Sequence, residues 1–524
     1  MKVAILGDDG PLARAAATAL ERRGHTVGVS DGECAICFPG SADLLRQAIA
    51  NGKFGRLVLR SHAAAYGANP KNPGMMDENR VSLLPASAPE RRWLEFEDIA
   101  AGHPNRAIIR FTNILAPEEG DPIVHKLMRR AAFAPAGRDP NVQFLSLEDA
   151  AELLAAACEG SATGVFNAAG AGAVPLKKAL AAAGATRVPI PGAIARGRLD
   201  QLQYTSTVSS ERARRELDWQ PARSTAEALA DFLATKPGAR PDVLREPFDD
   251  WGLDPAYIRV WGAWFWFLRN VYWRIEHEGM ENIPAAGRAL FVANHRGLMP
   301  LDAVMHLSLI LKHRRRIPRF LIIHSLLRPP FLCNFLTKLG GVIASQENAA
   351  RLFGGENLVG IFPEGIRGAF TPYRRAYQLR DFSKSGFARI AIENQAPVIP
   401  AAVVGHAEIF PILGRIDWSY LTREWGWPYL PIAPMLPLAP VPLPSKWHVR
   451  VLEPVPLQGL RPADGENARL VKEFSRHIQH LLQQNIDDMV ARRKHIFWGK
   501  LRSDAPPASE SRPQPSTRTA RASR

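Results

Sequence analysis

The sequence predicts an α/β protein made of two domains. Short apolar runs typical of buried strands alternate with helical segments, beginning with Lys2–Leu6 and the Ala-rich Leu12–Arg23. A chain of 524 residues is also too long for one hydrophobic core. The stretch Thr235–Asp250 holds three prolines and a glycine, as inter-domain linkers do. We therefore expect a doubly wound parallel sheet in residues 1–234 and a second α/β domain in residues 251–501.

The expected elements follow this alternation along the chain. In the first domain, strands are expected at Lys2–Leu6, His25–Ser30, Glu33–Phe38, Arg56–Ser61, Ala107–Phe111 and Gly164–Ala168. In the second domain, strands are expected at Arg288–Val292, Asn357–Phe362, Val398–Val404 and Trp447–Leu452, with helices at Leu301–Lys312 and Glu466–Arg492. Residues 502–524 combine Ser, Pro, Arg and Ala without periodicity, which predicts a disordered tail.

Charge is spread unevenly between the two halves. Residues 1–240 hold 29 Lys and Arg against 26 Asp and Glu, so the remaining residues hold 37 against 25, a balance of +12. A basic half implies an anionic partner. Five tryptophans fall between Trp251 and Trp273, and Trp-rich apolar segments flanked by Arg suit a bilayer interface better than a nucleic-acid groove. We expect an anionic membrane surface and no nucleic acid, although the same tryptophans could instead pack in a core or between domains.

The sequence also indicates a compartment. No run of 18 uncharged apolar residues exists, which predicts no transmembrane helix. Met1 leads directly into a strand pattern, which argues against a secretory signal peptide. Four cysteines in so long a chain argue against a disulfide framework, and Cys34 and Cys37 are interpreted as strand residues despite their redox spacing. We expect a cytoplasmic protein, peripheral on the inner face of the membrane.

The first domain carries a loop that could hold a dinucleotide. Gly7 and Gly10 follow a strand and open a helix, where glycines let the backbone approach a pyrophosphate at a helix N-terminus. Asp31, at the end of the second strand, could accept hydrogen bonds from an adenosine ribose. The third glycine of the usual pattern is Ala13, and two aspartates stand in the loop where a phosphate would bind. Gly7, Gly10 and Asp31 are the candidate cofactor-binding residues.

Other segments of this domain add a resemblance. They are Ser61–Gly67, Ile109–Leu115, Phe144–Ala150 and Ala213–Pro221, in that order. With them, residues 1–234 resemble an extended short-chain dehydrogenase/reductase of the NAD-dependent epimerase and dehydratase group, which implies a Rossmann-like fold. That family uses a Tyr-x-x-x-Lys pair, whereas the corresponding region, Leu84–Glu97, contains neither residue. The chain before Ser61 is also short, as if a strand–helix unit were missing. We expect a degenerate domain without redox chemistry, and NAD(P) binding without turnover stays open.

The second domain carries a histidine with an aspartate close behind, His295 and Asp302. Such a pair is sufficient to form a general base, because the carboxylate fixes the imidazole tautomer and stabilises the imidazolium. Gly297 and Pro300 allow a turn that could bring Asp302, at the start of a helix, back to His295. A His–Asp pair at this spacing alone could equally lie on a surface or cap a helix.

Three further blocks follow in the chain: Leu339–Asn348, Ile361–Arg367 and Ala396–Val404. Together with His295 and Asp302 they resemble the phospholipid/glycerol (lysophospholipid) acyltransferase family over residues 251–501, which implies an α/β glycerolipid-acyltransferase domain. The resemblance implies that Glu364 holds an acceptor hydroxyl and Arg367 a phosphate, with the turn exposing Glu364 and the amide of Gly365. The usual spacing is His-x4-Asp, whereas six residues intervene here.

The resemblance implies O-acyl transfer from acyl-CoA or acyl carrier protein to a lipid hydroxyl, with His295 as general base and Asp302 as its partner. The second block lacks the Arg that glycerol-phosphate users carry, which favours a lysophospholipid, acylglycerol or related lipid alcohol as acceptor. No nucleophilic Ser or Cys, metal or cofactor is required for this chemistry. Two alternatives remain, an NAD(P)-dependent epimerase or reductase anchored by the second domain, and a membrane scaffold that senses nucleotide.

Overall fold

A computed structural model gives the fold of the chain. It describes residues 1–7, 9–28, 32–51, 54–72, 74–80, 88–195, 199–245, 249–382, 386–434 and 441–503. The chain divides into two compact units. The first contains Met1–Val260 together with Leu321–Asn348, and the second contains Trp261–Phe320 and the residues from Ala349 onward. Most of the segment expected to form a tail, 502–524, lies outside the described residues.

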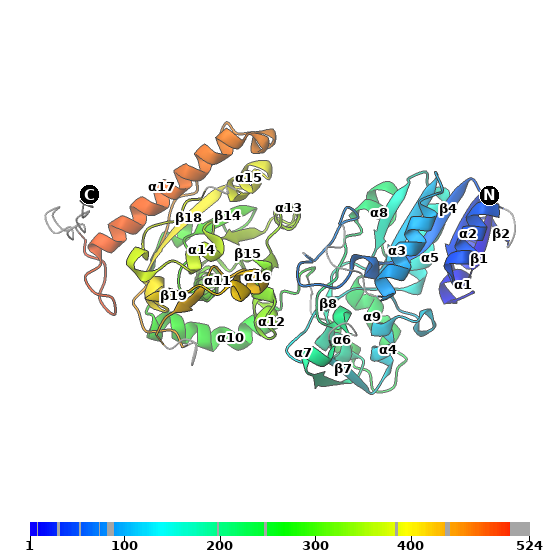
Figure 1. Cartoon of the computed structure of the whole chain (residues 1–524), viewed down its shortest axis with the longest axis horizontal. Helices are drawn as coiled ribbons and strands as arrows, with labels where there is room; N and C mark the ends of the chain where they lie inside the picture. The colour runs from blue at the N-terminus through cyan, green and yellow to red at the C-terminus, as the bar shows by residue number, and fades with distance from the viewer. Residues whose placement is uncertain are drawn as a thin grey trace, which may run out of the picture. The chain divides into compact units, whose positions relative to one another are not determined.

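The first unit contains a six-stranded sheet, all of whose neighbours pair in parallel (Figure 1). In spatial order its strands are β10 (Gly164–Ala168), β5 (Arg106–Phe111), β4 (Arg56–His62), β3 (Cys34–Phe38), β1 (Lys2–Gly7) and β2 (Thr26–Gly28). The predicted doubly wound sheet is confirmed. Among the residues that the structure describes, one strand, β2, lies beyond β1, whereas the usual dinucleotide-binding order places two there. This agrees with the short chain before Ser61, which suggested that a strand–helix unit is missing.

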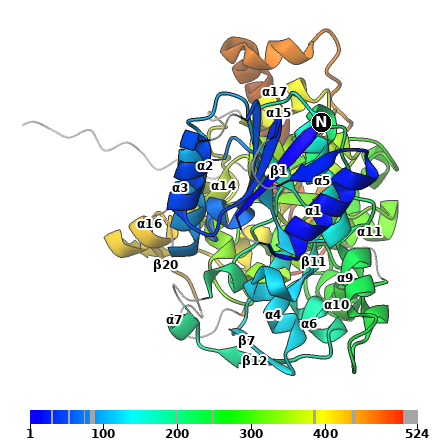
Figure 2. The same cartoon turned by 90° about the vertical axis from the view of Figure 1, so that its right-hand side faces the viewer.

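Helices cover both faces of this sheet, as Figure 2 shows. The helices α1 (Pro11–Arg22) and α5 (Leu147–Glu159) pack on one face, and α2 (Ala42–Asn51) and α3 (Ala88–Ala100) pack on the other. Strand β3 shows the two-residue alternation that this requires, since Cys34 lies in one cluster and Cys37 in the other. Both are buried free thiols, so their interpretation as strand cysteines is confirmed.

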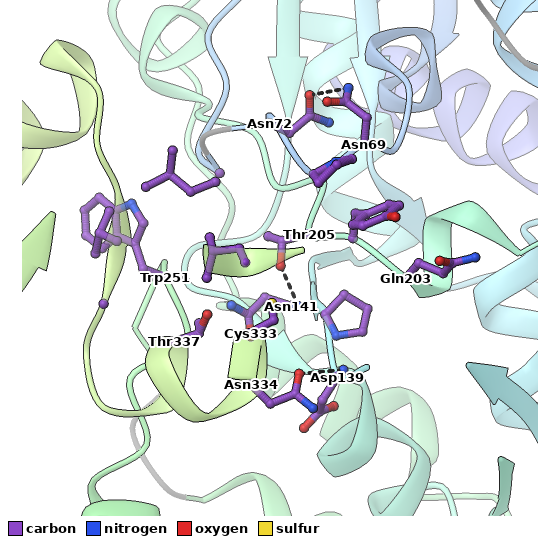
Figure 3. A pocket seen from close by; sticks show the side chains of 18 of the residues that line it. Asn69, Asn72, Asp139, Asn141, Gln203, Thr205, Trp251, Cys333, Asn334 and Thr337 are labelled. Carbon is purple, nitrogen blue, oxygen red and sulfur yellow. Dashed lines mark hydrogen bonds between the residues drawn. The ribbon is translucent and has the colours of Figure 1, made fainter. Parts of the chain in front are cut away.

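The first unit also includes the segment Leu321–Asn348. Its helix α12 (Leu332–Lys338) contacts the loop after β7 (Ala131–Pro135). The Asp139 amide donates to Asn334 Oδ1 at 2.9 Å (Figure 3). In addition, Lys338 Nζ lies 2.7 Å from Asp139 Oδ2. A cavity of about 60 Å³ beside this contact has room for about two water molecules. The sequence did not predict that this segment joins the first unit.

The second half of the chain is built on a mixed sheet of seven strands. Their order is β13 (Glu276–Glu278), β21 (His448–Val451), β18 (Val398–Val404), β14 (Ala289–Ala293), β17 (Leu358–Ile361), β15 (Arg319–Ile322) and β16 (Val342–Ile343). The end of β15 and all of β16 belong to the segment Leu321–Asn348, which the division into units groups with the first unit. Only β18 and β21 pair antiparallel. The four strands expected from the sequence in this half are all confirmed, each within one residue at either end.

Two long helices complete this unit. Helix α11 (Leu301–Arg314) begins directly after the candidate site, and α17 (Ala468–Arg492) packs against β18. The buried residues of α17 recur every three or four positions, as the sequence pattern predicted. They are Val471, Ser475, Ile478, Leu482, Ile486 and Met489. No helix in the described part of the chain is long and apolar enough to cross a bilayer.

Candidate active site

The candidate site lies where the central strands β14 and β17 end, on the carboxyl side of a parallel arrangement. Asn294, the first residue after β14, accepts from the Val403 amide at 2.8 Å and donates to the Val403 carbonyl at 3.0 Å. These two bonds anchor the start of the loop to the neighbouring strand β18. His295 therefore leaves the sheet from a fixed backbone position, at the edge where open α/β sheets bind their ligands.

The turn that follows brings Asp302 back to His295. Gly297 has φ +85°, and a Cβ there would lie 2.8 Å from the His406 carbonyl oxygen, so only glycine fits. Leu298 also has positive φ, and Pro300 stands immediately before α11. His295 Nδ1 and Asp302 Oδ2 are 2.6 Å apart. The six intervening residues thus still bring the histidine and the aspartate into contact.

The electrostatics of the pair suit a general base. The Asp302 side chain is fully buried, and its second oxygen accepts the Ala303 amide at 2.9 Å, at the positive end of α11. When Asp302 accepts a hydrogen bond from Nδ1–H, Nε2 is the unprotonated nitrogen of the neutral ring. Among the described residues, no group bonds Nε2. The His295 side chain is 11% exposed and stacks on Phe362, with ring centroids 4.7 Å apart.

Glu364 lies differently from the sequence expectation. The turn was predicted to expose its carboxylate, but the side chain has no exposed surface. One oxygen accepts Arg296 Nη1 at 2.7 Å and the His295 amide at 3.3 Å, and the other accepts the Arg380 amide at 2.8 Å. The expectation of exposure is wrong because the buried guanidinium of Arg296 needs a counter-charge, and Glu364 turns inward to supply it.

Arg296 is the residue that sequence reasoning missed. It is 2% exposed, and its guanidinium also donates to the carbonyls of Ala376, His295 and Gln378 at 2.6, 2.6 and 2.8 Å. It thereby ties the His295 loop to the segment after the third sequence block. Only its place directly after His295 hinted at this role, because a buried and an exposed arginine look alike in a sequence.

The remaining residues of the third block divide in their exposure. The Gly365 amide donates to the Phe362 carbonyl at 2.9 Å, so the prediction of a free amide is wrong, because the turn closes on itself. Arg367, on the short helix α14 (Gly365–Ala369), is exposed. No acidic group in the described part of the chain pairs with its guanidinium. It is the one predicted substrate-binding side chain with unused hydrogen-bond donors.

Two further histidines lie close to the site, and both are uncharged near pH 7. His306, on α11, is buried among the rings of Phe291, Phe320 and Phe362, and burial lowers its pKa to about 4. Burial also lowers the pKa of His406 well below its ordinary value. Both rings are therefore neutral near pH 7. No second imidazolium competes with the charge that His295 would acquire on taking a proton.

In the first unit, the glycines predicted to meet a cofactor lie where expected. Gly7 ends β1 with φ +100°, and a Cβ there would lie 1.9 Å from the Phe38 carbonyl oxygen. A glycine is thus required at this position because strand β3 approaches it closely, whether or not a ligand binds. Gly10 immediately precedes α1. Asp31, the third candidate, lies outside the described residues.

Comparison with known proteins places the second half of the chain. The family described as Acyltransferase matches residues 274–404. An uncharacterized protein of Mycobacterium leprae (strain TN) is 32% identical over 292 residues, which cover 52% of this chain and 78% of that protein. An uncharacterized protein of Mycobacterium tuberculosis (strain ATCC 25618 / H37Rv) is 32% identical over 290 residues, or 53% and 80%.

Two other similarities complete the comparison. The DGAT1/2-independent enzyme synthesizing storage lipids of Bos taurus is 29% identical over 209 residues, which cover 39% of this chain and 60% of that enzyme. A solved UDP-N-acetylglucosamine 4-epimerase from Bacillus cereus covers 45% of this chain and 98% of its own, at 17% identity and a TM-score of 0.37. The chain covers more than two thirds of its mycobacterial relatives at 32% identity, and its second half matches the acyltransferase model. The chain therefore belongs to the acyltransferase family.

Proposed function

We propose that this protein is a lipid O-acyltransferase with His295 as its general base. It moves a fatty acyl group from an acyl thioester, acyl-CoA or acyl carrier protein, to the hydroxyl of a lysophospholipid, acylglycerol or related lipid alcohol. The observation that carries the proposal is the 2.6 Å contact between His295 Nδ1 and the buried Asp302, which leaves Nε2 unbonded by any described group. Family membership supports the reaction class, and this geometry supports His295 as the base.

The proposed reaction is a direct transfer. The acceptor hydroxyl donates its proton to His295 Nε2 while its oxygen attacks the thioester carbonyl carbon. A carbon–oxygen bond forms, the carbon–sulfur bond breaks, and the departing thiolate takes the proton back from the imidazolium. Asp302 stabilises the imidazolium between these steps. The Phe362 ring against His295 provides an apolar wall that favours acyl transfer over attack by water.

Two residues of the third block take different roles in this proposal. Arg367, exposed and without a described acidic partner, would bind a phosphate of the acceptor or donor. Glu364 supports the His295 loop without facing the substrate, because its carboxylate accepts hydrogen bonds from the His295 amide and the Arg296 guanidinium. We therefore assign Glu364 as a positioning residue. The acceptor hydroxyl would be held by His295 itself.

The acceptor is proposed to be a lipid because of two independent indications. The bovine relative is described as an enzyme synthesizing storage lipids. In addition, three tryptophan side chains are about half exposed, which suits insertion into a bilayer interface. They are Trp264, Trp266 and Trp418, at 50%, 56% and 51%. With the positive charge of this half, they support a cytoplasmic protein bound peripherally to the anionic inner face of a membrane. Sedimentation with vesicles of neutral and anionic lipid would test this location.

The function is tested by acyl transfer with purified protein and a His295→Ala variant. Radiolabelled acyl-CoA and, separately, acyl carrier protein would be supplied with a panel of lysophospholipids, monoacylglycerols and diacylglycerols. We expect labelled product with the wild type and none with the variant. A His306→Asn variant, which alters a buried histidine outside the reaction, serves as the matched control and should retain activity. Product that persists in His295→Ala would contradict the proposed base, and no product with either donor would contradict the proposed reaction.

A further inference from the structure

The first unit carries the loop that binds a pyrophosphate in dinucleotide-binding folds. Strand β1 ends at Gly7, and helix α1 begins at Pro11. In such folds the first amides of this helix and its positive dipole end meet the pyrophosphate. If the unit binds NAD(P), those amides should face open space. In this structure one of them, the Leu12 amide, meets a carboxylate of the same chain.

The carboxylate belongs to Glu119, which lies 107 residues further along the chain. Its Oε1 accepts the Leu12 amide at 2.9 Å. The same oxygen lies 3.0 Å from the position of a Cβ built on Gly10, so it occupies the space that the glycine leaves open. The side chain is only 10% exposed. Glu119 thus takes both features of the phosphate cradle, its helix amide and its glycine gap.

A counter-charge keeps this buried carboxylate in place. Arg60 Nη2, on β4, lies 3.5 Å from Glu119 Oε2, and the Arg60 side chain is 11% exposed. The Arg60 guanidinium also lies over the Trp93 ring, 4.6 Å from its centroid. A pyrophosphate in this position would have to displace Glu119 from both partners, or share the site with it at the cost of like-charge repulsion.

The segment that carries Glu119 is anchored at both ends. It forms a short turn, η2 (Pro117–Glu119), closed by the Gly120 amide donating to the Pro117 carbonyl at 3.1 Å. Asp121 follows and caps α4 (Pro122–Met128) through the Ile123 amide at 2.8 Å. Asp121 also lies 3.3 Å from His62 Nε2. Glu119 therefore projects from a fixed backbone.

The region that would carry redox chemistry is equally occupied. Helix α3 presents Trp93 and Glu97 one turn apart, the spacing of the Tyr-x-x-x-Lys pair that the sequence lacks. Glu97 accepts from Ser61 Oγ at 2.5 Å and pairs with Arg110 at 2.5 Å. A carboxylate here cannot supply the positive charge that lowers a tyrosine pKa. These polar groups therefore satisfy one another.

We propose that the dinucleotide site of the first unit is closed from within, with the Glu119 carboxylate standing in the place of the cofactor pyrophosphate. The residues present do not fit NAD(P), and the unit binds none while Glu119 holds the α1 amide. The unit keeps the dinucleotide-binding fold, but the Glu119 side chain of the same chain occupies its anion site. This inference is independent of the acyl-transfer proposal.

The test compares dinucleotide binding by the full-length wild type with binding by Glu119→Gln and Glu119→Ala. NAD⁺, NADH, NADP⁺, NADPH and ADP-ribose would be titrated calorimetrically, and the reduced forms also by their fluorescence. Glu118→Ala, an exposed neighbour in the same turn, is the matched control. Circular dichroism and thermal melts would confirm that each variant folds. We expect no saturable binding by the wild type or the control, and binding at least about tenfold tighter after loss of the Glu119 charge.

Each outcome decides the proposal. Saturable binding to ADP-ribose or a dinucleotide that appears in a folded Glu119 variant would support it. Wild-type binding that is as tight as that of the variants would overturn it, because the carboxylate would then not obstruct the site. The absence of binding by every folded variant would also overturn it, because something other than Glu119 would then exclude the ligand. Glu119→Gln keeps an acceptor for the Leu12 amide and thus separates lost charge from lost capping.

Discussion

Substitution of Asp302 by asparagine should abolish most of the acyl-transfer rate without unfolding the protein. The carboxylate accepts from the His295 ring, and its second oxygen accepts the Ala303 amide in the first turn of α11. The amide oxygen of asparagine can accept the same Ala303 amide. The backbone turn from Gly297 should therefore persist in the variant. What is lost is the negative charge beside the ring when His295 takes the acceptor proton.

The magnitude follows from the geometry. With Nδ1 and Oδ2 of His295 and Asp302 only 2.6 Å apart, the two charges are bonded directly. Two unit charges roughly 4 Å apart at an effective dielectric of about 20 attract by about 4 kcal/mol. If the attraction is realised only in the transition state, its loss corresponds to about a thousandfold in kcat. KM should change little, because the neutral ring of the ground state does not use the charge.

The assay is steady-state acyl transfer with the acceptor identified by the panel above, measured for wild type and Asp302→Asn at saturating donor. Thermal melts of both proteins serve as the folding control. A folded Asp302→Asn protein that keeps more than about a tenth of the wild-type kcat would refute the reasoning. In that case Asp302 would only bond the Ala303 amide in the first turn of α11, and His295 would act without a charged partner.

Three further predictions concern neighbouring residues. Glu364→Gln should destabilise the protein by about 3 to 5 kcal/mol, because it leaves the buried Arg296 guanidinium without a counter-charge; urea unfolding measures this, and a loss under about 1 kcal/mol would argue against it. Arg367→Gln should raise KM for phosphate-bearing acceptors and leave neutral acylglycerols unaffected, whereas an equal change for both would deny Arg367 a phosphate role. His306 has its pKa lowered to about 4 against 6.5 in the unfolded chain, so the unfolded state takes up the proton first as pH falls, and up to about 3 kcal/mol of stability is lost between pH 6.5 and pH 4. His306→Phe should flatten this loss in unfolding experiments across that range, and an unchanged slope would show that other groups cause it.

The sequence predicted well those features that depend on local pattern. Apolar runs such as Val398–Val404 became central strands, and the small residue at Gly297 marked the turn that returns Asp302 to His295. These features follow from side-chain period and backbone conformation, which neighbouring residues determine. The family resemblance then added the order of the blocks, from which the candidate site was predicted before any distance was known.

Features that depend on distant partners escaped the sequence. Glu364 was expected to face the acceptor, but whether a turn residue points outward or inward depends on a partner 68 positions away, Arg296. Glu119 and Leu12 are separated by 107 positions, and nothing in the local pattern connects them. Polar side chains carry no period that tells a buried partner from a hydrated one, so such pairs become visible only once the fold brings them together.

The placement of Leu321–Asn348 has a consequence for how the chain is made. This segment belongs to the first unit, yet the ribosome synthesises it only after the first sixty residues of the second unit, Trp261–Phe320, have emerged. The Asp139 loop therefore acquires its hydrogen bond to Asn334 and its ion pair with Lys338 only after that stretch has been made. These contacts are among the last of the first unit to become possible during synthesis, after every strand of its parallel sheet has been made.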